Sequence, residues 1–178
     1  VYRGVPLLSD YRSFGGGVFA LERLILGNVE LEAGVRYDHE TRQAYIPKKT
    51  YQSLVREDRI EVDQCAVLET RSRCRSKFHA GTVSFGSLVR ISEAFLAKLD
   101  LSSATRMPTI DEQYINGTSP SFPIMARGLA ALGPETSWSL SGTLETNLSW
   151  LSAELSTYGS FIEDYIYLSP ELRDDGTV

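Results

Sequence analysis

The feature of this sequence that most limits its fold is a strict alternation of apolar and polar residues. In segment 28–38 the odd positions read Val, Leu, Ala, Val and Tyr, while the even positions from 30 read Glu, Glu, Gly, Arg and Asp. Alternate side chains of a β-strand point to opposite faces, whereas a helix would mix the two sets. The segment is therefore predicted to be a strand with one wholly apolar face and one charged face.

Five further segments are predicted to be strands from the same period of two. They are residues 17–26, 82–91, 95–103, 138–148 and 151–157. The first is the weakest, because both of its faces are apolar in places. The alternation falters after Gly159, so the pattern does not define where the last strand ends.

The connections between these segments alternate in length. Tight turns are predicted near residues 26–28, 92–93 and 149–150, whereas links 38–77 and 104–136 each exceed 30 residues. Long loops at one end and tight turns at the other are expected of outer-membrane barrels. The predicted fold class is all-β: an antiparallel, up-and-down transmembrane β-barrel segment of about six strands, with tight periplasmic turns and long extracellular loops.

Aromatic residues lie near the ends of the predicted strands. Phe95 and Trp150 are close to the short turns, and Tyr37 and Trp138 are close to the long loops. Trp150 is assigned to its turn because it is out of phase with the apolar face. Rings at these positions fit the aromatic girdles of membrane barrels, and they equally fit ordinary packing at the edge of a sheet.

Composition excludes other classes of protein. The formal net charge is −5, which argues against a nucleic-acid binder, and the one basic cluster, within residues 71–77, is interpreted as a solvated loop. Hydrophobic residues make up 42% of the chain, and no segment approaches the ~20 apolar residues of a membrane helix. A barrel strand needs only ~9–11 alternating residues, so the barrel interpretation survives.

Cysteine and histidine are scarce. Cys65 and Cys74 are the only cysteines, with no histidine beside them, so a metal site is poorly supported. A disulfide that closes a small loop and a pair of free thiols both remain open. His39 and His79 are the only histidines and belong to no nucleophile or metal-ligand motif. We therefore expect no enzymatic activity, no metal and no cofactor.

Several motifs resemble those of TonB-dependent receptors, in the order of that family. Residues 106–114, Arg-Met-Pro-Thr-Ile-Asp-Glu-Gln-Tyr, resemble its Arg-x-Pro-Thr…Glu-Leu-Tyr signature, and residues 99–105 resemble the strand before it. Residues 31–38 resemble its Gly-x-Arg-Tyr-Asp strand, 132–137 its Leu-x-Pro-Glu-x-Ser segment, and 161–168 its strand ending in Asp-Tyr-Ile. Two departures stand out: Gln113 replaces the usual Leu, and Gly-Leu-Ala-Ala at 128–131 replaces a Gly-Asn pair.

The resemblance implies a place in the bacterial outer membrane, with the apolar faces against lipid and the polar faces around a plug domain. The charged residues expected to face that interior are Glu30, Glu32, Arg36, Lys98, Asp100, Glu145 and Glu154. The family has about 22 strands, a plug and a TonB-contacting segment. Because the last two are not evident here, we expect residues 1–178 to be a partial barrel domain that transports nothing alone.

The implied function is uptake of a scarce nutrient, driven through the plug by the inner-membrane TonB energising complex. The commonest cargo is an iron-siderophore complex, with cobalamin, haem or glycans as alternatives. The loop residues considered as ligand contacts are Arg106, Asp111, Glu112 and Tyr114. A competing interpretation gives the signature a folding role, in which Pro108 limits the backbone and Thr109 caps a short helix with Glu112.

Two other classes stay open at this level. The first is a secreted, soluble β-sandwich that binds carbohydrate or protein through long loops, and it requires the apolar faces to pack against each other. The second is a barrel enzyme or adhesin. An enzyme would need Ser, His and acid side chains converging near one rim, and the sequence offers no such grouping.

Overall fold

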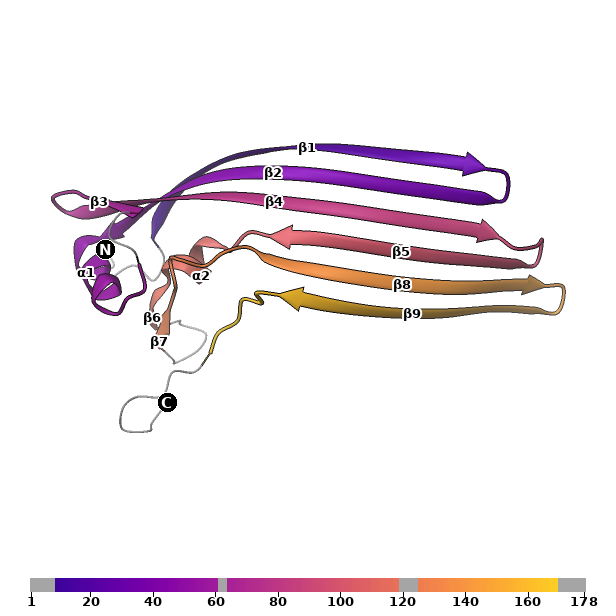
Figure 1. Cartoon of the computed structure of the whole chain (residues 1–178). Coiled ribbons are helices and arrows are strands. Elements are labelled where there is room, and N and C mark those ends of the chain that lie inside the picture. Colours follow the sequence, from indigo (N-terminus) through magenta and orange to yellow (C-terminus); the bar gives the residue numbers. More distant parts are fainter. Residues whose placement is uncertain (1–8, 61–63, 119–124, 170–178) are drawn as a thin grey trace, which may run out of the picture.

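The computed structural model describes residues 9–60, 64–118 and 125–169. Its six long strands are β1 (Asp10–Leu26), β2 (Val29–Pro47), β4 (Arg71–Arg90), β5 (Phe95–Arg106), β8 (Glu135–Leu148) and β9 (Leu151–Glu163). They lie in that order in one antiparallel sheet, each long strand beside the next one along the chain (Figure 1). The all-β, up-and-down fold predicted from the alternation is confirmed.

Tight turns connect the strands at one end of the sheet, and the long links lie at the other end (Figure 1). β1 and β2 are separated by two residues, and so are β8 and β9. In the first turn, Gly27 has a φ of 59°, in the left-handed region that glycine adopts without a steric penalty. The predicted asymmetry between the two ends is therefore present.

Several strands extend further toward the long links than the alternation predicted. β2 continues to Pro47 and β4 begins at Arg71, and the two stay in register from Val29 opposite Val89 to Pro47 opposite Arg71. The interpretation of the basic cluster as a solvated loop is wrong, because these residues form the first part of β4. The long link between the strands is residues 48–70, rather than 38–77.

The two faces of the sheet differ as predicted. On one face large apolar side chains are exposed, among them Val35 (54%), Leu144 (56%) and Leu155 (70%). A soluble β-sandwich would bury such residues against a second sheet. Within the described ranges the only other sheet is the small pair β6 (Asn116–Thr118) and β7 (Met125–Arg127), so the packing that a sandwich requires is not found.

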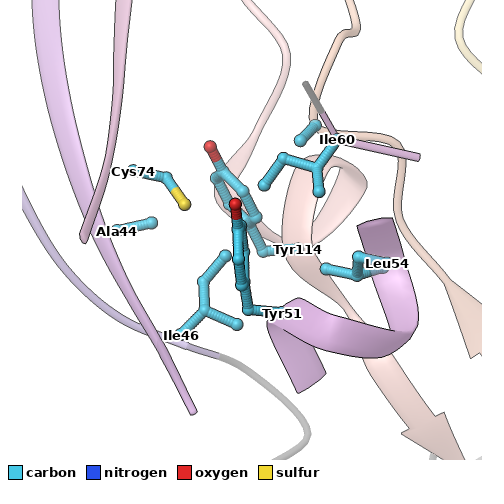
Figure 2. Packing of buried hydrophobic residues seen from close by; sticks show 8 residues of the cluster. Ala44, Ile46, Tyr51, Leu54, Ile60, Cys74 and Tyr114 are labelled. Carbon is cyan, nitrogen blue, oxygen red and sulfur yellow. The ribbon is translucent and has the colours of Figure 1, made fainter. Parts of the chain in front are cut away.

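A small hydrophobic core lies against one end of the sheet, the end with the long links. It involves helix α1 (Lys48–Arg56), strand β3 (Cys65–Val67), helix α2 (Ile110–Tyr114) and the upper parts of β2 and β4. The buried residues are Ala44, Ile46, Tyr51, Leu54, Ile60, Cys74, Tyr114 and Ala130 (Figure 2). Because they come from both long links, the two loops pack on each other. Within the part of the chain that is described, no helix is long and apolar enough to cross a membrane.

Candidate functional site

The charged residues predicted to line an interior all lie on the polar face of the sheet. The register places Glu32 opposite Gly86, Gly86 opposite Asp100, and Lys98 opposite Thr143. Glu30 and Arg36 share the parity of Glu32, and Glu145 lies directly opposite Glu154. One face of the sheet thus carries these charges, on β2, β5, β8 and β9, as the alternation indicated.

Charges on this polar face are partly neutralised within it. Arg23 forms an ion pair with Glu30, and Lys98 forms one with Glu145 across two neighbouring strands. The Arg36 Nε atom lies 2.6 Å from Oδ2 of Asp38, which is two positions away on the same face. Such pairs offset the repulsion between like charges that share one face of a sheet.

The signature segment begins helix α2 with a capping box. The Thr109 Oγ1 atom accepts a hydrogen bond from the backbone N–H of Glu112 at 3.4 Å. In return, the Glu112 carboxylate accepts one from the backbone N–H of Thr109 at 2.6 Å. Two otherwise unpaired donors at the helix start are satisfied in this way. The folding role considered for this segment is thus seen in the structure.

Arg106, at the end of β5, connects this helix to the next long strand. Its guanidinium lies 3.1 Å from the Glu112 carboxylate and 2.6 Å from the carboxylate of Glu135, the first residue of β8. Burial alone would raise the pKa of Glu112, but hydrogen bonds from Arg106 and Thr109 outweigh that effect and lower its pKa. Glu112 therefore stays ionised and holds Arg106 in place.

The four candidate ligand contacts differ in accessibility. Arg106 and Asp111 are exposed, whereas Glu112 is half-buried and Tyr114 is only 2% exposed. The Tyr114 ring packs in the loop core, and its hydroxyl lies 3.4 Å from Ser76 Oγ. Burial raises the pKa of Tyr114, although the bond to Ser76 and the charge of Arg42 oppose the shift. Arg106 and Asp111 are thus the exposed candidates, although the guanidinium of Arg106 is already bonded to Glu112 and Glu135.

Gln113, which departs from the family signature, is fully buried, and both polar atoms of its side-chain amide are hydrogen-bonded. Its Nε2 donates a hydrogen bond to the Ala130 carbonyl at 3.1 Å, and its Oε1 accepts one from Arg42 Nη1 at 2.9 Å. Arg42 is 7% exposed, donates also to the Pro108 carbonyl at 2.8 Å, and forms an ion pair with Glu40. A leucine could make none of these bonds, so the departure joins β2, α2 and the segment after β7.

Arg42 was not identified from the sequence. It lies in the polar run 38–43, where no alternation distinguishes a buried charge from a solvated one. Buried charges need paired, hydrogen-bonded surroundings. Glu40 supplies the ion pair from two positions away, whereas Pro108 and Gln113, which accept the other hydrogen bonds, are more than 60 positions away. The unusual Gln113 was the one available signal.

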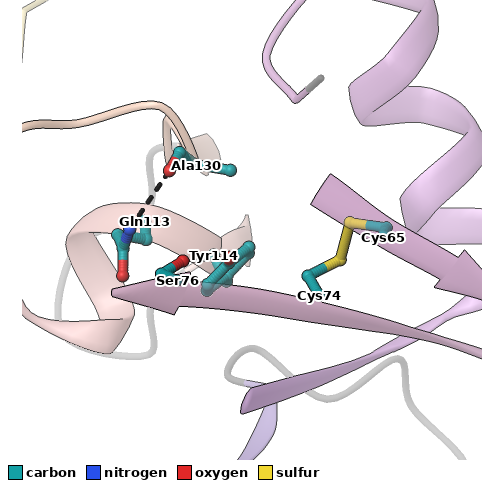
Figure 3. Close-up of a disulfide and its surroundings, with 6 residues drawn as sticks. All are labelled: Cys65, Cys74, Ser76, Gln113, Tyr114 and Ala130. Atoms are coloured by element: carbon teal, nitrogen blue, oxygen red, sulfur yellow. Dashed lines mark hydrogen bonds between the residues drawn. A yellow bond between two sulfur atoms is a disulfide. The ribbon is translucent and has the colours of Figure 1, made fainter. Parts of the chain in front are cut away.

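A disulfide fixes the first long link to the sheet. Cys65 of β3 and Cys74 of β4 lie directly opposite each other and are joined, which decides between the two alternatives left by the sequence (Figure 3). Since Cys74 is buried in the loop core, the bond ties β3 to that core. Such bonds persist in oxidising compartments. In the described residues, no group of three His, Cys, Asp or Glu side chains is arranged to hold a metal ion.

Comparison with known families supports what the sheet and the motifs indicate. A family model described as "TonB dependent receptor-like, beta-barrel" matches residues 4–178. The chain belongs to this family of TonB-dependent receptor β-barrels. No curated protein matches it, and neither does any solved structure. Members of the family are outer-membrane receptors for nutrient uptake rather than enzymes.

Proposed function

We propose that residues 1–178 form part of the barrel wall of an outer-membrane TonB-dependent receptor that takes up a scarce nutrient. The observation that carries this proposal is the separation of faces over β2, β4, β5, β8 and β9, with exposed apolar residues on one side and most of the charged residues on the other. β1 is less clearly divided, since Phe19 and Leu21 lie on its polar face. In a membrane the apolar face meets hydrocarbon, since a charge near the midplane would cost roughly 2–4 kcal/mol.

The polar face is proposed to line the water-filled interior and to surround the plug domain. Its charges are the seven residues assigned to the interior above, together with their partners Arg23 and Asp38. β1 and β9 are the edges of the described sheet, and open edges are not tolerated in hydrocarbon. We therefore propose that both edges pair with further strands of the same receptor, and that the TonB complex acts through the plug.

An iron-siderophore complex is the cargo that we propose, because it is the commonest cargo that the family resemblance implies. The packed loops would offer it a preformed surface, since their positions are held by a common core, a disulfide and the Arg42–Gln113 contact. Preorganised loops lose less conformational entropy on binding than mobile ones. Arg106 and Asp111 are the contacts of first choice, because they are exposed.

Two kinds of cells test this proposal: cells from which the receptor gene is deleted, and the same cells complemented with the whole receptor or a variant. Together they test the membrane receptor and its cargo. Loss of the receptor should abolish growth on the cognate ferric siderophore as the only iron source. Asp111→Asn should weaken siderophore binding by roughly tenfold or more, the usual scale for a hydrogen bond to a charged group. Glu93→Gln, an exposed carboxylate in the opposite turn, is the matched control and should leave binding unchanged.

The outcomes distinguish an error in the proposed cargo from an error in the receptor assignment. If the deleted cells lose uptake of cobalamin, haem or a glycan but keep iron uptake, the siderophore assignment is wrong and the receptor assignment stands. If the whole protein is recovered as a soluble species without detergent, the membrane assignment itself is refuted.

A further inference from the structure

The start of β4 carries a row of positive charges on one face of the sheet. From Arg71 to Ala80 exposure alternates: the even positions are buried, apart from the half-buried Ser76, and the odd positions are exposed. Because side chains alternate along a strand, Arg73, Arg75 and Lys77 lie on the same face as Val83, which is exposed further down. The face that is apolar low on the strand therefore becomes basic toward the loops.

Neighbouring strands add one cation and no uncompensated acid to this row. Lys77, Arg75 and Arg73 lie opposite Thr41, Gln43 and Tyr45 of β2. Gln43 is in turn opposite Arg12 of β1, which is also exposed. We call Arg12, Arg73, Arg75 and Lys77 the basic ladder. On this face of β1 the acidic residue beside the ladder is Asp10, which is already paired with Arg71 at 3.1 Å, whereas Glu22 lies ten residues from Arg12, further down the strand.

The charges of the basic ladder have no ion-pair partner in the part of the chain that the structure describes. Among the described residues, none of its four members forms an ion pair. By contrast, Arg23, Arg36 and Arg42 on the opposite face of the same sheet each have a carboxylate partner. Although the chain has a net charge of −5, four uncompensated cations on one surface produce a local positive potential that attracts anions.

The height of the basic ladder above the apolar belt indicates what that anion is. A membrane strand uses ~9–11 residues, so a crossing that starts near Val89 ends near His79. Lys77, Arg75 and Arg73 then lie roughly 7, 13 and 20 Å further along the strand. At a tilt of ~40° these positions are about 5, 10 and 15 Å above the hydrocarbon, so Lys77 lies in the headgroup layer of roughly 5–8 Å and Arg75 and Arg73 lie just outside it. Long basic side chains can also reach back toward that level.

We infer that the basic ladder binds phosphate groups of lipid headgroups in the outer leaflet. This inference rests on the proposed membrane placement, since it needs the apolar face to meet lipid. Guanidinium groups bind phosphate oxygens through two parallel hydrogen bonds, and a neighbouring ammonium adds a third positive contact. A lipid source is favoured over free phosphate because the ladder continues the surface that already contacts lipid, and it faces away from the loop core.

The test uses the whole receptor in nanodiscs of phosphatidylcholine, with or without phosphatidylglycerol. Bound lipid is counted by native mass spectrometry. The wild type should retain phosphatidylglycerol selectively, and Arg73→Gln/Arg75→Gln/Lys77→Gln should lower its apparent affinity roughly tenfold or more. The control triple variant is Lys48→Gln/Lys49→Gln/Arg56→Gln, which removes three exposed cations from α1 and should bind like the wild type.

Each alternative result has a defined meaning. Equal retention by the wild type and the ladder variant overturns the inference, and so does an equal loss in the control variant. Displacement of the lipid by inorganic phosphate at matched concentration would identify a free-anion site instead. Lys77→Arg keeps the charge and should bind like the wild type, which separates lost charge from lost folding. Failure of the receptor to enter nanodiscs at all would refute the proposed function, whereas entry without lipid selectivity refutes only this inference.

Discussion

The assignment of the apolar face to lipid can be tested by placing one charge at the centre of β8. Leu144 lies on the exposed apolar face, opposite Ala97 of β5 and Leu155 of β9. It is six residues from Trp138 and six from Trp150, the aromatic residues that flank this strand. Six residues span about 20 Å along a strand, or about 15 Å in height at a ~40° tilt. Leu144 therefore lies within the hydrocarbon layer.

Leu144→Arg should destabilise the folded receptor by roughly 2–4 kcal/mol, the cost measured for a basic residue at the midplane of a barrel. That corresponds to a decrease of about 30-fold to nearly 1000-fold in the folding equilibrium constant. The cost arises because the guanidinium loses its hydration and the lipid tails offer no acceptor. Trp138→Arg, at the interface, should have a charge cost of only about 0–1 kcal/mol.

The matched control is Ser141→Arg on the opposite face of the same strand. Ser141 already donates a hydrogen bond to Asp100 at 3.5 Å, so a guanidinium there gains a carboxylate and stays hydrated. The assay measures how folding of the whole receptor into phosphatidylcholine vesicles depends on the concentration of guanidinium chloride. The folded fraction is read from heat-modifiable migration on gels. If Ser141→Arg costs as much as Leu144→Arg, the two faces are not separated into lipid and water, and the reasoning fails.

Three further predictions concern the loop core. Cys65→Ala should lower the local stability of β3 by about 2–3 kcal/mol, because a loop of about ten residues is no longer closed, and amide hydrogen exchange should show faster opening there. Gln113→Leu should lower the local stability of the loop core by about 1–3 kcal/mol, because polar partners of Gln113 are left unpaired. In an Arg42→Met background the same substitution should cost much less. Hydrogen exchange on α2 measures both effects, and additive costs would contradict the coupling of the two residues. Because the pKa of Glu112 is lowered in the folded state, its ionised carboxylate stabilises the loop fully above about pH 4.3, and this stabilisation is lost as pH falls through the folded-state pKa. Glu112→Gln should therefore make the rate of loop proteolysis depend less on acid pH.

The sheet could be predicted from the sequence because each strand contains its own signal. In β2 the charges Glu30, Glu32 and Arg36 occupy one parity, which is the pattern of a strand with one apolar and one polar face. The capping box was predictable for the same reason, since Thr109 and Glu112 are three residues apart. Features of this kind depend on neighbours along the chain.

The missed features depend on contacts between distant segments. Arg42 is buried because Gln113 and Pro108 reach it from another loop, and the disulfide could not be decided because only the pairing of β3 with β4 places Cys65 opposite Cys74. Whether Tyr114 contacts ligand or packs in a core also depends on α1 and β4. No periodicity in 104–136 contains this information.

The early ends of the predicted strands have a physical cause that supports the membrane assignment. Low on β4 the exposed apolar residues have odd numbers, such as Val83 and Phe85, whereas near the loops the buried Phe78 and Ala80 have even numbers. The strand continues unbroken while its apolar parity inverts, so a search for one constant parity stops at the inversion. A soluble sheet packed on one core has no reason to change its apolar face along a strand. A wall that leaves the bilayer does, because outside the membrane water replaces lipid on its outer face, and the packed loops become its only dry surface.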